Sequence, residues 1–247
     1  MKVILSITSV PPRFAYLGEI ARRLSVQSVD EIWINIPRQY NRFPGWDGSV
    51  PKELPVGGGK VRVNRVDRDY GPGTKFIGPA LELDPEDLII YLDDDTLYPP
   101  KKLASALLQS HHTEPTCAWG LSGFNFTDYF KGVYPRAHGM QVDVLEGYGG
   151  VVVKAGWVQA VLPEFMDLLQ ETWHDDMILC NLLEKSNIPR KTVCTAECNF
   201  TMVQQLQFGF AADALHHVAG GAHVENNKKI LQNFQAAGRE YYSYELL

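Results

Sequence analysis

The sequence of 247 residues lacks any hydrophobic run long enough to cross a membrane. A membrane-spanning helix needs roughly 18 or more consecutive apolar residues. The first segment, MKVILSITSV, carries one lysine and a short apolar run, but PPRF follows it without a small-residue cleavage site. We therefore interpret this segment as a first core strand rather than a signal peptide, and we expect no membrane span and a location in the cytoplasm.

Cysteine and positive charge are also scarce. The four cysteines match no zinc-binding spacing and are too few for a disulfide framework, so we expect reduced, buried thiols of an intracellular protein. The 23 Lys and Arg residues against 29 Asp and Glu residues give a formal net charge of -6. This balance argues against broad nucleic-acid binding, but it leaves room for a local basic site for a phosphorylated small molecule.

Strand-like and helical segments alternate along the first half of the chain. Apolar, β-branched runs predict strands at residues 2–8, 31–37, 60–66 and 87–92, and helical periodicity predicts helices at 15–27 and near 103–107. The second half predicts strands within 116–124, 140–153 and 191–198, and helices at 175–187 and 225–238. This rhythm predicts an α/β fold with a mostly parallel central sheet flanked by helices.

The stretch DLIIYLDDDTLYPP ends an apolar run on three adjacent carboxylates, Asp93, Asp94 and Asp95. Ligands of open parallel sheets bind beyond the carboxyl ends of the strands. A D-x-D arrangement suits Mn²⁺ or Mg²⁺, whose remaining ligands are waters and substrate phosphates. We expect Asp93 and Asp95 to bind such an ion, with Asp94 pointing elsewhere in the ligand site. The alternative is a solvated turn in which an aspartate caps the following helix.

Two other chemistries that use a D-x-D arrangement match less well. Aspartyl-phosphate phosphatases want Thr or Val two positions after the second aspartate, where this chain has Leu97. Sugar nucleotidyltransferases want a basic, glycine-rich loop after the first strand, where this chain has SVPPRF. Both alternatives are weakened.

Further candidates follow other predicted strands. In DYGPGTK, Lys75 follows a glycine-rich turn and is a candidate contact for a diphosphate, as is Arg13 after SVPP; either is alternatively a solvated surface cation. In LEGYGG, Glu146 precedes Gly149 and Gly150, which would let the backbone approach a ligand closely. The alternative there is a β-turn with a surface glutamate.

Two acidic residues and a group of histidines complete the candidates. In ETWHDDM, Asp175 and Asp176 begin a predicted helix, where the helix dipole alone would favour them. The functional alternative is a general base near an acceptor, beside Trp173 as a stacking platform. Three histidines lie between residues 216 and 223, and one of them, for which we take His216, is a candidate metal ligand.

In this order, the motifs resemble the GT-A glycosyltransferase superfamily, in particular small family-2-like transferases and the compact glycosyltransferase domains of large algal viruses. The resemblance is carried by ILSITSVPPRF, IWINIP, DYGPGTK, IIYLDDDTLYP, EGYGG and HDDM, which extend from residue 3 to about 180. It implies one GT-A domain over 1–247, with a nucleotide-binding half to about 100 and an acceptor-binding half from about 101. If the protein is viral, the expected location is the host cytoplasm.

The resemblance also implies ligands and residue roles. The donor would be a nucleotide-diphosphate-sugar, usually UDP-linked, bound with Mn²⁺ or Mg²⁺, and the acceptor a glycan or glycoconjugate. The D-x-D motif falls on Asp93 and Asp95, and Lys75 lies near the diphosphate. The nucleoside contacts fall on Thr8, Asn35 and Asp69.

The base motif of the superfamily falls on Asp176, with Asp175 in the place of a glutamate; the shorter side chain leaves the assignment between the two open. These roles predict a metal-dependent enzyme that transfers a hexosyl or deoxyhexosyl group with inversion by direct displacement. A retaining enzyme would not need the base and is also compatible with the sequence. The alternatives are a non-catalytic nucleotide- or carbohydrate-binding module and a metal-dependent phosphohydrolase. The presence of both DDD and HDD favours an enzyme, because a pure binder has no use for the second.

Overall fold

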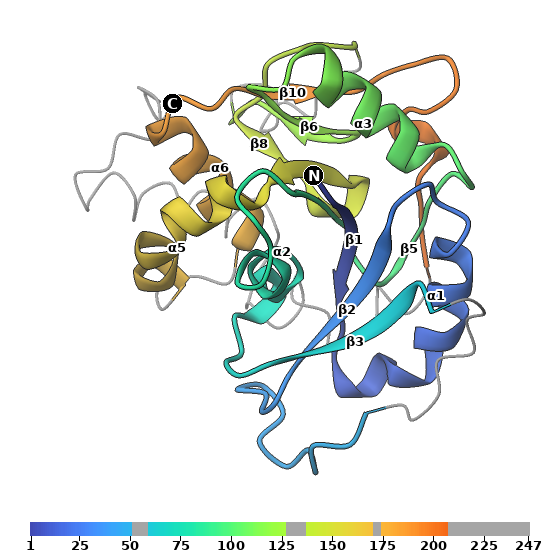
Figure 1. Ribbon diagram of the computed structural model, residues 1–247, viewed down its shortest axis with the longest axis vertical. Helices are drawn as coiled ribbons and strands as arrows, with labels where there is room; N and C mark the ends of the chain where they lie inside the picture. The colour runs from blue at the N-terminus through green and yellow to red at the C-terminus, as the bar shows by residue number, and fades with distance from the viewer. Residues whose placement is uncertain (51–58, 127–136, 170–173, 207–247) are drawn as a thin grey trace.

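The computed structural model describes residues 1–50, 59–126, 137–169 and 174–206. A seven-stranded sheet with the order β10-β6-β9-β4-β1-β2-β3 forms its centre (Figure 1). All neighbours pair in parallel except β9, which is antiparallel to both β4 and β6. The strands are β1 (Val3–Thr8), β2 (Glu31–Pro37), β3 (Val61–Val66), β4 (Leu88–Tyr91), β6 (Ala118–Gly120), β9 (Val151–Lys154) and β10 (Arg190–Thr192).

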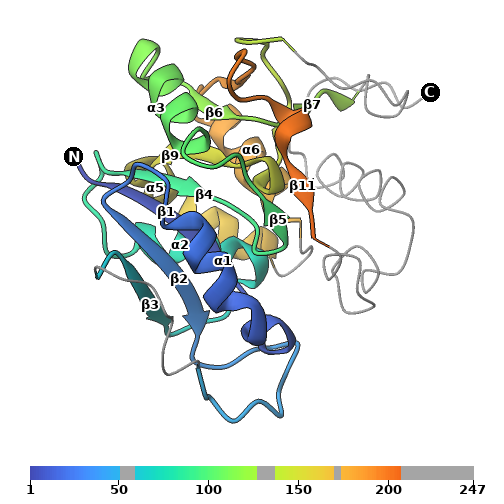
Figure 2. The same ribbon diagram turned by 90° about the vertical axis from the view of Figure 1, so that its right-hand side faces the viewer.

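Helices cover both faces of this sheet (Figures 1 and 2). On one face, α1 (Leu17–Leu24) and α3 (Leu103–Thr113) enclose one hydrophobic core. On the other face, α2 (Thr74–Ala80), α5 (Ala155–Leu169) and α6 (Asp175–Lys185) enclose a second core. The predicted α/β architecture, a mostly parallel sheet flanked by helices, is therefore confirmed.

The alternation of side chains along β4 decides where the three aspartates point. Tyr91 packs in the core under α2, α5 and α6, and Leu92 packs in the opposite core under α1 and α3. Successive side chains of an extended chain point to opposite faces. Asp93 therefore continues on the side of α2 and α6, and Asp94 on the side of α1.

Small elements shape the edges of the sheet. Figure 2 shows β5 (Thr96–Leu97) beside β11 (Gln204–Gln205), an antiparallel pair that brings residues 204–206 next to Asp95 and β5. Here the N–H of Leu206 donates to the carbonyl of Asp95 at 2.5 Å. The remaining small elements are η1 (Pro11–Tyr16), η2 (Gly71–Gly73), β5 (Thr96–Leu97), β7 (Gly123–Phe124), β8 (Val144–Leu145), η3 (Gly147–Gly149), η4 (Phe200–Met202) and β11 (Gln204–Gln205).

The structure differs from the sequence-based expectation mainly in the second half. The strands expected within 140–153, around a glycine-rich turn, are present as β8 and β9 with η3 between them. The strand expected over 191–198 ends at Thr192, because a turn follows in which the N–H of Thr195 donates to the carbonyl of Cys198 at 2.9 Å. The helix expected over 225–238 lies outside the described residues.

The four cysteines are free thiols. Cys117, Cys180 and Cys198 are buried as expected, whereas Cys194 is partly exposed. In the part of the chain that the structure describes, none of the helices has the length and apolarity needed to cross a bilayer.

Candidate active site

The side chain of Lys75 connects the DDD and HDD motifs. Lys75 lies in the first turn of α2, after the turn η2, and its side chain is only 3% exposed. Its Nζ lies 2.7 Å from Oδ1 of Asp93, 2.9 Å from Oδ2 of Asp175 and 3.9 Å from Oδ1 of Asp176. Two acidic motifs that are far apart in the sequence therefore meet around one buried ammonium group.

Arg13 is the second cation of the site. Its Nη1 lies 2.5 Å from Oδ1 of Asp94 and 3.2 Å from Oδ2 of Asp95. The hydroxyl of Ser9 donates to the other oxygen of Asp94 at 2.5 Å. Burial raises the pKa of Asp94, and burial together with the charges of Asp93 and Asp94 raises the pKa of Asp95 to about 6. The three adjacent aspartates are thus partly neutralised by the protein itself.

Asp175 and Asp176 differ in their exposure and contacts. The side chain of Asp175 is 9% exposed and lies in direct contact with Lys75, whereas the side chain of Asp176 is 23% exposed. Oδ2 of Asp176 accepts the N–H of Gly147 at 2.7 Å. Burial raises the pKa of both carboxyls, that of Asp176 well above its usual range, although Lys75 opposes the shift. Asp176 is the more accessible and the more basic candidate.

Glu146 lies on the same side of the site. Its Oε2 accepts the hydroxyl of Ser122 at 2.6 Å, and burial raises its pKa to about 7, with a further contribution from the negative charge of Asp93. In the following turn, Gly149 packs against Ser122, and Gly150 has a φ of 89°, which favours glycine. The protein's own packing thus accounts for both glycines, and their contact with a ligand stays a prediction.

Thr8 and Asn35 are engaged within the sheet. The hydroxyl of Thr8 donates to the carbonyl of Asn35 at 2.8 Å. The Asn35 amide is buried; it donates to Oγ of Ser6 at 2.7 Å and accepts from the amide of Asn64 at 3.0 Å. Their predicted contacts with a nucleoside stay predictions.

Asp69 organises the backbone beyond β3. Its Oδ1 accepts the N–H of Gly71 and its Oδ2 accepts the N–H of Asn41, both at 2.8 Å. The carboxylate thereby ties the loop after β2 to the turn before α2. A nucleoside contact of Asp69 also stays a prediction. Trp173 and His216 lie outside the described residues.

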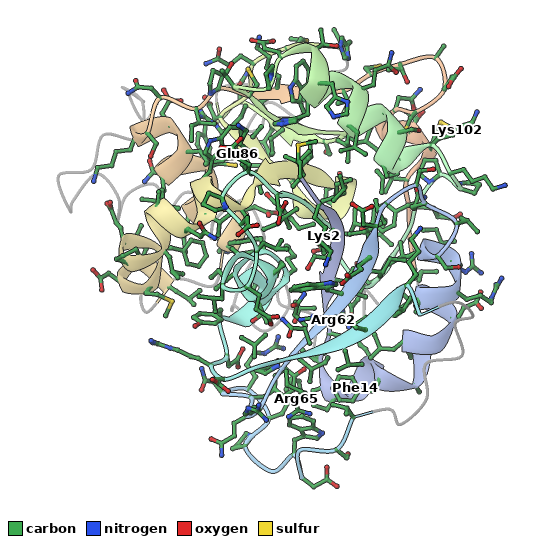
Figure 3. The ribbon with its side chains drawn as sticks, in the orientation of Figure 1. Lys2, Phe14, Arg62, Arg65, Glu86 and Lys102 are labelled. Carbon is green, nitrogen blue, oxygen red and sulfur yellow. The ribbon has the colours of Figure 1, made fainter. Side chains whose placement is uncertain are left out.

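An apolar hollow that the sequence pattern did not indicate lies at Pro11 and Pro12, immediately before Arg13 in the chain. It has a volume of about 290 Å³ and is lined by Pro11, Pro12, Phe43, Gly45 and Trp46. The ring of Trp46 lies 5.8 Å from that of Phe14 and 5.4 Å from the guanidinium of Arg65; Figure 3 labels Phe14 and Arg65 at this end of the molecule. The available signal was two aromatic residues in a loop otherwise rich in proline and glycine.

The acidic side chains fit a divalent cation in part. Among the described residues, no group of three His, Cys, Asp or Glu side chains is arranged to hold a metal ion unaided. However, the carboxylates of the site outnumber Lys75 and Arg13, the two cations that the described residues place among them, and negative charge in excess favours a bound cation. Asp93 and Asp95 therefore suit Mn²⁺ or Mg²⁺ that takes further ligands from substrate phosphates and water. The carboxylates are Asp93, Asp94, Asp95, Glu146, Asp175 and Asp176.

No protein-family model matches the chain, and no curated protein matches its sequence. Solved structures are similar in fold. The mannosyltransferase PcManGT from Pyrobaculum calidifontis, in complex with GDP-Man and Mn²⁺, matches with a TM-score of 0.58 and 11% identity, over 98% of this chain and 66% of that chain. GalNAc-T7 with UDP, GalNAc and Mn²⁺ matches with a TM-score of 0.55 and 10% identity, over 84% of this chain and 44% of that chain.

Identities this low show the fold alone. The chain has the GT-A type of α/β fold, with its mostly parallel seven-stranded sheet flanked by helices. It spans about two thirds of the mannosyltransferase chain and less than half of the GalNAc-T7 chain. The further resemblance to transferases of algal viruses rests on sequence motifs only.

Proposed function

We propose that this protein is a metal-dependent glycosyltransferase that moves a sugar from a nucleotide-diphosphate-sugar, expected to be UDP-linked, to a hydroxyl of a glycan or glycoconjugate. The observation that carries the proposal is the contact of Lys75 with both Asp93 and Asp175. This contact brings the motif expected to bind the cation next to the motif expected to supply the base. The fold shared with two structures solved with nucleotide or nucleotide-sugar and Mn²⁺ supports the same conclusion.

The donor would lie on the side of Arg13. Asp93 and Asp95 would hold Mn²⁺ or Mg²⁺, which supplies charge stabilisation to a departing diphosphate when it is bound. Arg13 fixes Asp94 and Asp95 from the side of α1. The hollow formed by Pro11, Pro12, Phe43, Gly45 and Trp46 has the apolar lining and the size to take a flat ring such as the nucleobase.

The acceptor would lie on the side of Asp176. In a direct displacement, the acceptor oxygen forms a bond to the anomeric carbon while the bond from that carbon to the diphosphate oxygen breaks. Asp176 accepts the proton of the acceptor hydroxyl, and the configuration at the anomeric carbon is inverted. General base catalysis of this kind typically contributes about 10²–10⁴-fold. The raised pKa of Asp176 makes its ionised form a stronger base than an ordinary aspartate.

Product analysis after incubation with a panel of nucleotide-sugars, Mn²⁺ and several glycan acceptors tests this function. A transferase yields a glycosylated acceptor together with the nucleoside diphosphate, and a chelator stops the reaction. A binding module yields neither product although it binds the nucleotide. A phosphohydrolase releases phosphate or a nucleoside monophosphate and leaves every acceptor unmodified. Either of the last two outcomes would contradict the proposal.

A further inference from the structure

A ladder of buried polar side chains crosses three neighbouring strands beneath α2. The amide of Asn64 on β3 donates to Oδ1 of Asn35 on β2 at 3.0 Å, and the amide of Asn35 donates to Oγ of Ser6 on β1 at 2.7 Å. Ser6 in turn donates its hydroxyl to the carbonyl of Lys75. Polar groups in a core are costly unless they are paired, and here each one is hydrogen-bonded to the next. The ladder therefore fixes the backbone of Lys75 relative to the sheet.

The ammonium group of Lys75 is also held in place, by the side chains around it. Its Nζ contacts Asp93 at 2.7 Å and Asp175 at 2.9 Å, and it lies 5.6 Å from the centre of the Tyr91 ring. A Cβ atom added to Gly147 would come within 2.7 Å of the same nitrogen. The side chain of Lys75 is only 3% exposed. Its ammonium group can therefore contact a diphosphate only if Asp93 or Asp175 moves away from it.

We propose that Lys75 is a positioning residue and not a contact of the diphosphate. It joins Asp93, after β4, to Asp175, at the start of α6, and thereby fixes the distance between the cation motif and Asp176. The ladder of Asn64, Asn35 and Ser6 sets the height of Lys75 above the sheet. The kinetic consequence of this proposal rests on the proposed glycosyl transfer, whereas its structural consequence does not.

The kinetic test is the variant Lys75→Met, which keeps most of the chain length and removes the charge. A misplacement of about 1 Å in a catalytic group can cost about 100-fold in rate, so we expect a loss of that order in kcat. At saturating Mn²⁺, the Kd for UDP should stay within about threefold of wild type, because no diphosphate contact is lost. The opposite pattern, UDP binding weakened by about tenfold or more with kcat retained, would identify a diphosphate contact and overturn the proposal.

Lys154→Met is the matched control. Lys154 lies on β9 and pairs with Glu86 (labelled in Figure 3) at 2.9 Å, so this variant also removes a paired lysine. We expect wild-type kcat and UDP binding from it. A loss in Lys154→Met equal to that in Lys75→Met would show that removal of any paired lysine suffices, and it would overturn the positioning role.

The ladder is tested with Ser6→Ala, which removes only the hydroxyl that holds the Lys75 carbonyl. We expect a smaller loss of kcat than in Lys75→Met. In the double variant, Ser6→Ala should cause no further loss, because residues that act through one another are not additive. Independent, multiplying losses would show that Ser6 does not act through Lys75.

A double-mutant cycle of Lys75→Met and Asp175→Asn tests the link without any transfer assay. Lys75→Met leaves the buried Asp175 without its cation, and Asp175→Asn leaves Lys75 with Asp93 as its nearest carboxylate, so the losses in the free energy of unfolding in urea should not add. Additive losses would overturn the link even if the wild-type enzyme transfers sugar. If the cycle shows coupling while wild type transfers nothing, the proposed function fails and the link between the two motifs stands.

Discussion

Oδ2 of Asp175 lies 2.9 Å from Nζ of Lys75, which ties the first turn of α6 to the first turn of α2. Because the same ammonium contacts Asp93, one lysine organises carboxylates from two motifs. Arg13 has the corresponding role for Asp94 and Asp95 on the other face of the sheet. The protein thus provides two separate cations for its acidic site: Lys75 contacts Asp93, and Arg13 contacts Asp94 and Asp95.

Replacement of Asp176, the proposed base, should slow transfer without weakening donor binding. Asp176→Asn should lower kcat for transfer by about 10²–10⁴-fold while donor binding stays at the wild-type level, because only the proton acceptor is removed. Steady-state kinetics measures kcat of the variant and of wild type, and titration with UDP and Mn²⁺ measures their donor binding. If Asp176→Asn transfers sugar at the normal rate, the assignment of the base is wrong.

Asp95→Asn should abolish metal-dependent binding of UDP as well as turnover. The change removes one of the two carboxylates expected to hold the cation while the side chain keeps its shape. Titration calorimetry with UDP, in the presence of Mn²⁺ and again with a chelator, measures the effect. Asp67→Asn is the matched control, because Asp67 is an exposed aspartate paired with Arg38. Metal-dependent binding that survives in Asp95→Asn would contradict the D-x-D assignment.

Arg13→Met should destabilise the protein strongly. It leaves the buried Asp94 without its cation, and breaking a buried ion pair of this kind costs about 3 kcal/mol or more. Arg38→Met breaks the exposed pair with Asp67 and should cost no more than about 1 kcal/mol. Urea unfolding of both variants measures the loss in the free energy of unfolding. Equal losses would show that Arg13 has no special structural role.

Glu146 should make stability depend on pH. Its folded pKa of about 7 lies above its usual value of 4.5, so the fold favours the neutral acid. The resulting penalty is absent below the unfolded pKa, grows as pH rises toward 7 and stays constant above it. Glu146→Gln lacks this penalty. Relative to wild type, its free energy of unfolding should therefore rise by about 2 kcal/mol as the pH rises from 5 to 8. Unfolding in urea at several pH values measures the gain.

The control for this pH dependence is Glu86→Gln, at a glutamate whose side chain is 76% exposed. Its difference from wild type should be the same at pH 5 and at pH 8. A Glu146→Gln difference that is equally flat across this range would show that this half-buried carboxyl ionises in the folded protein as freely as it does in the unfolded chain.

The strands of the first half could be predicted from sequence because their apolar runs are bounded by clear turn residues. The helices α2 and α5 were not identified, because Pro79 lies inside the first and Pro163 inside the second, and proline normally ends a helix. The sequence likewise did not indicate that β9 is antiparallel to its neighbours. Its apolar run VVVK indicates burial on both faces, but direction depends on the path of the connecting chain.

The membership of the site was largely predictable, but its pairing was not. Lys75, Arg13 and the aspartates follow recognisable turns and strand ends, so their convergence could be expected. Which cation contacts which carboxylate depends on side-chain direction and on the depth of α2 in the core, and neither is encoded locally. Asn35 illustrates this limit, because the sequence did not indicate that its amide hydrogen-bonds to Ser6 and Asn64, and its nucleoside contact stays a prediction.

The most direct test of the account is a crystal structure of the protein soaked with UDP and MnCl₂, with anomalous diffraction used to locate manganese. We predict a manganese peak between the carboxylates of Asp93 and Asp95 and the diphosphate of UDP, with the nucleobase in the hollow beside Arg13. A nucleotide bound elsewhere, or no manganese at these two aspartates, would contradict the account.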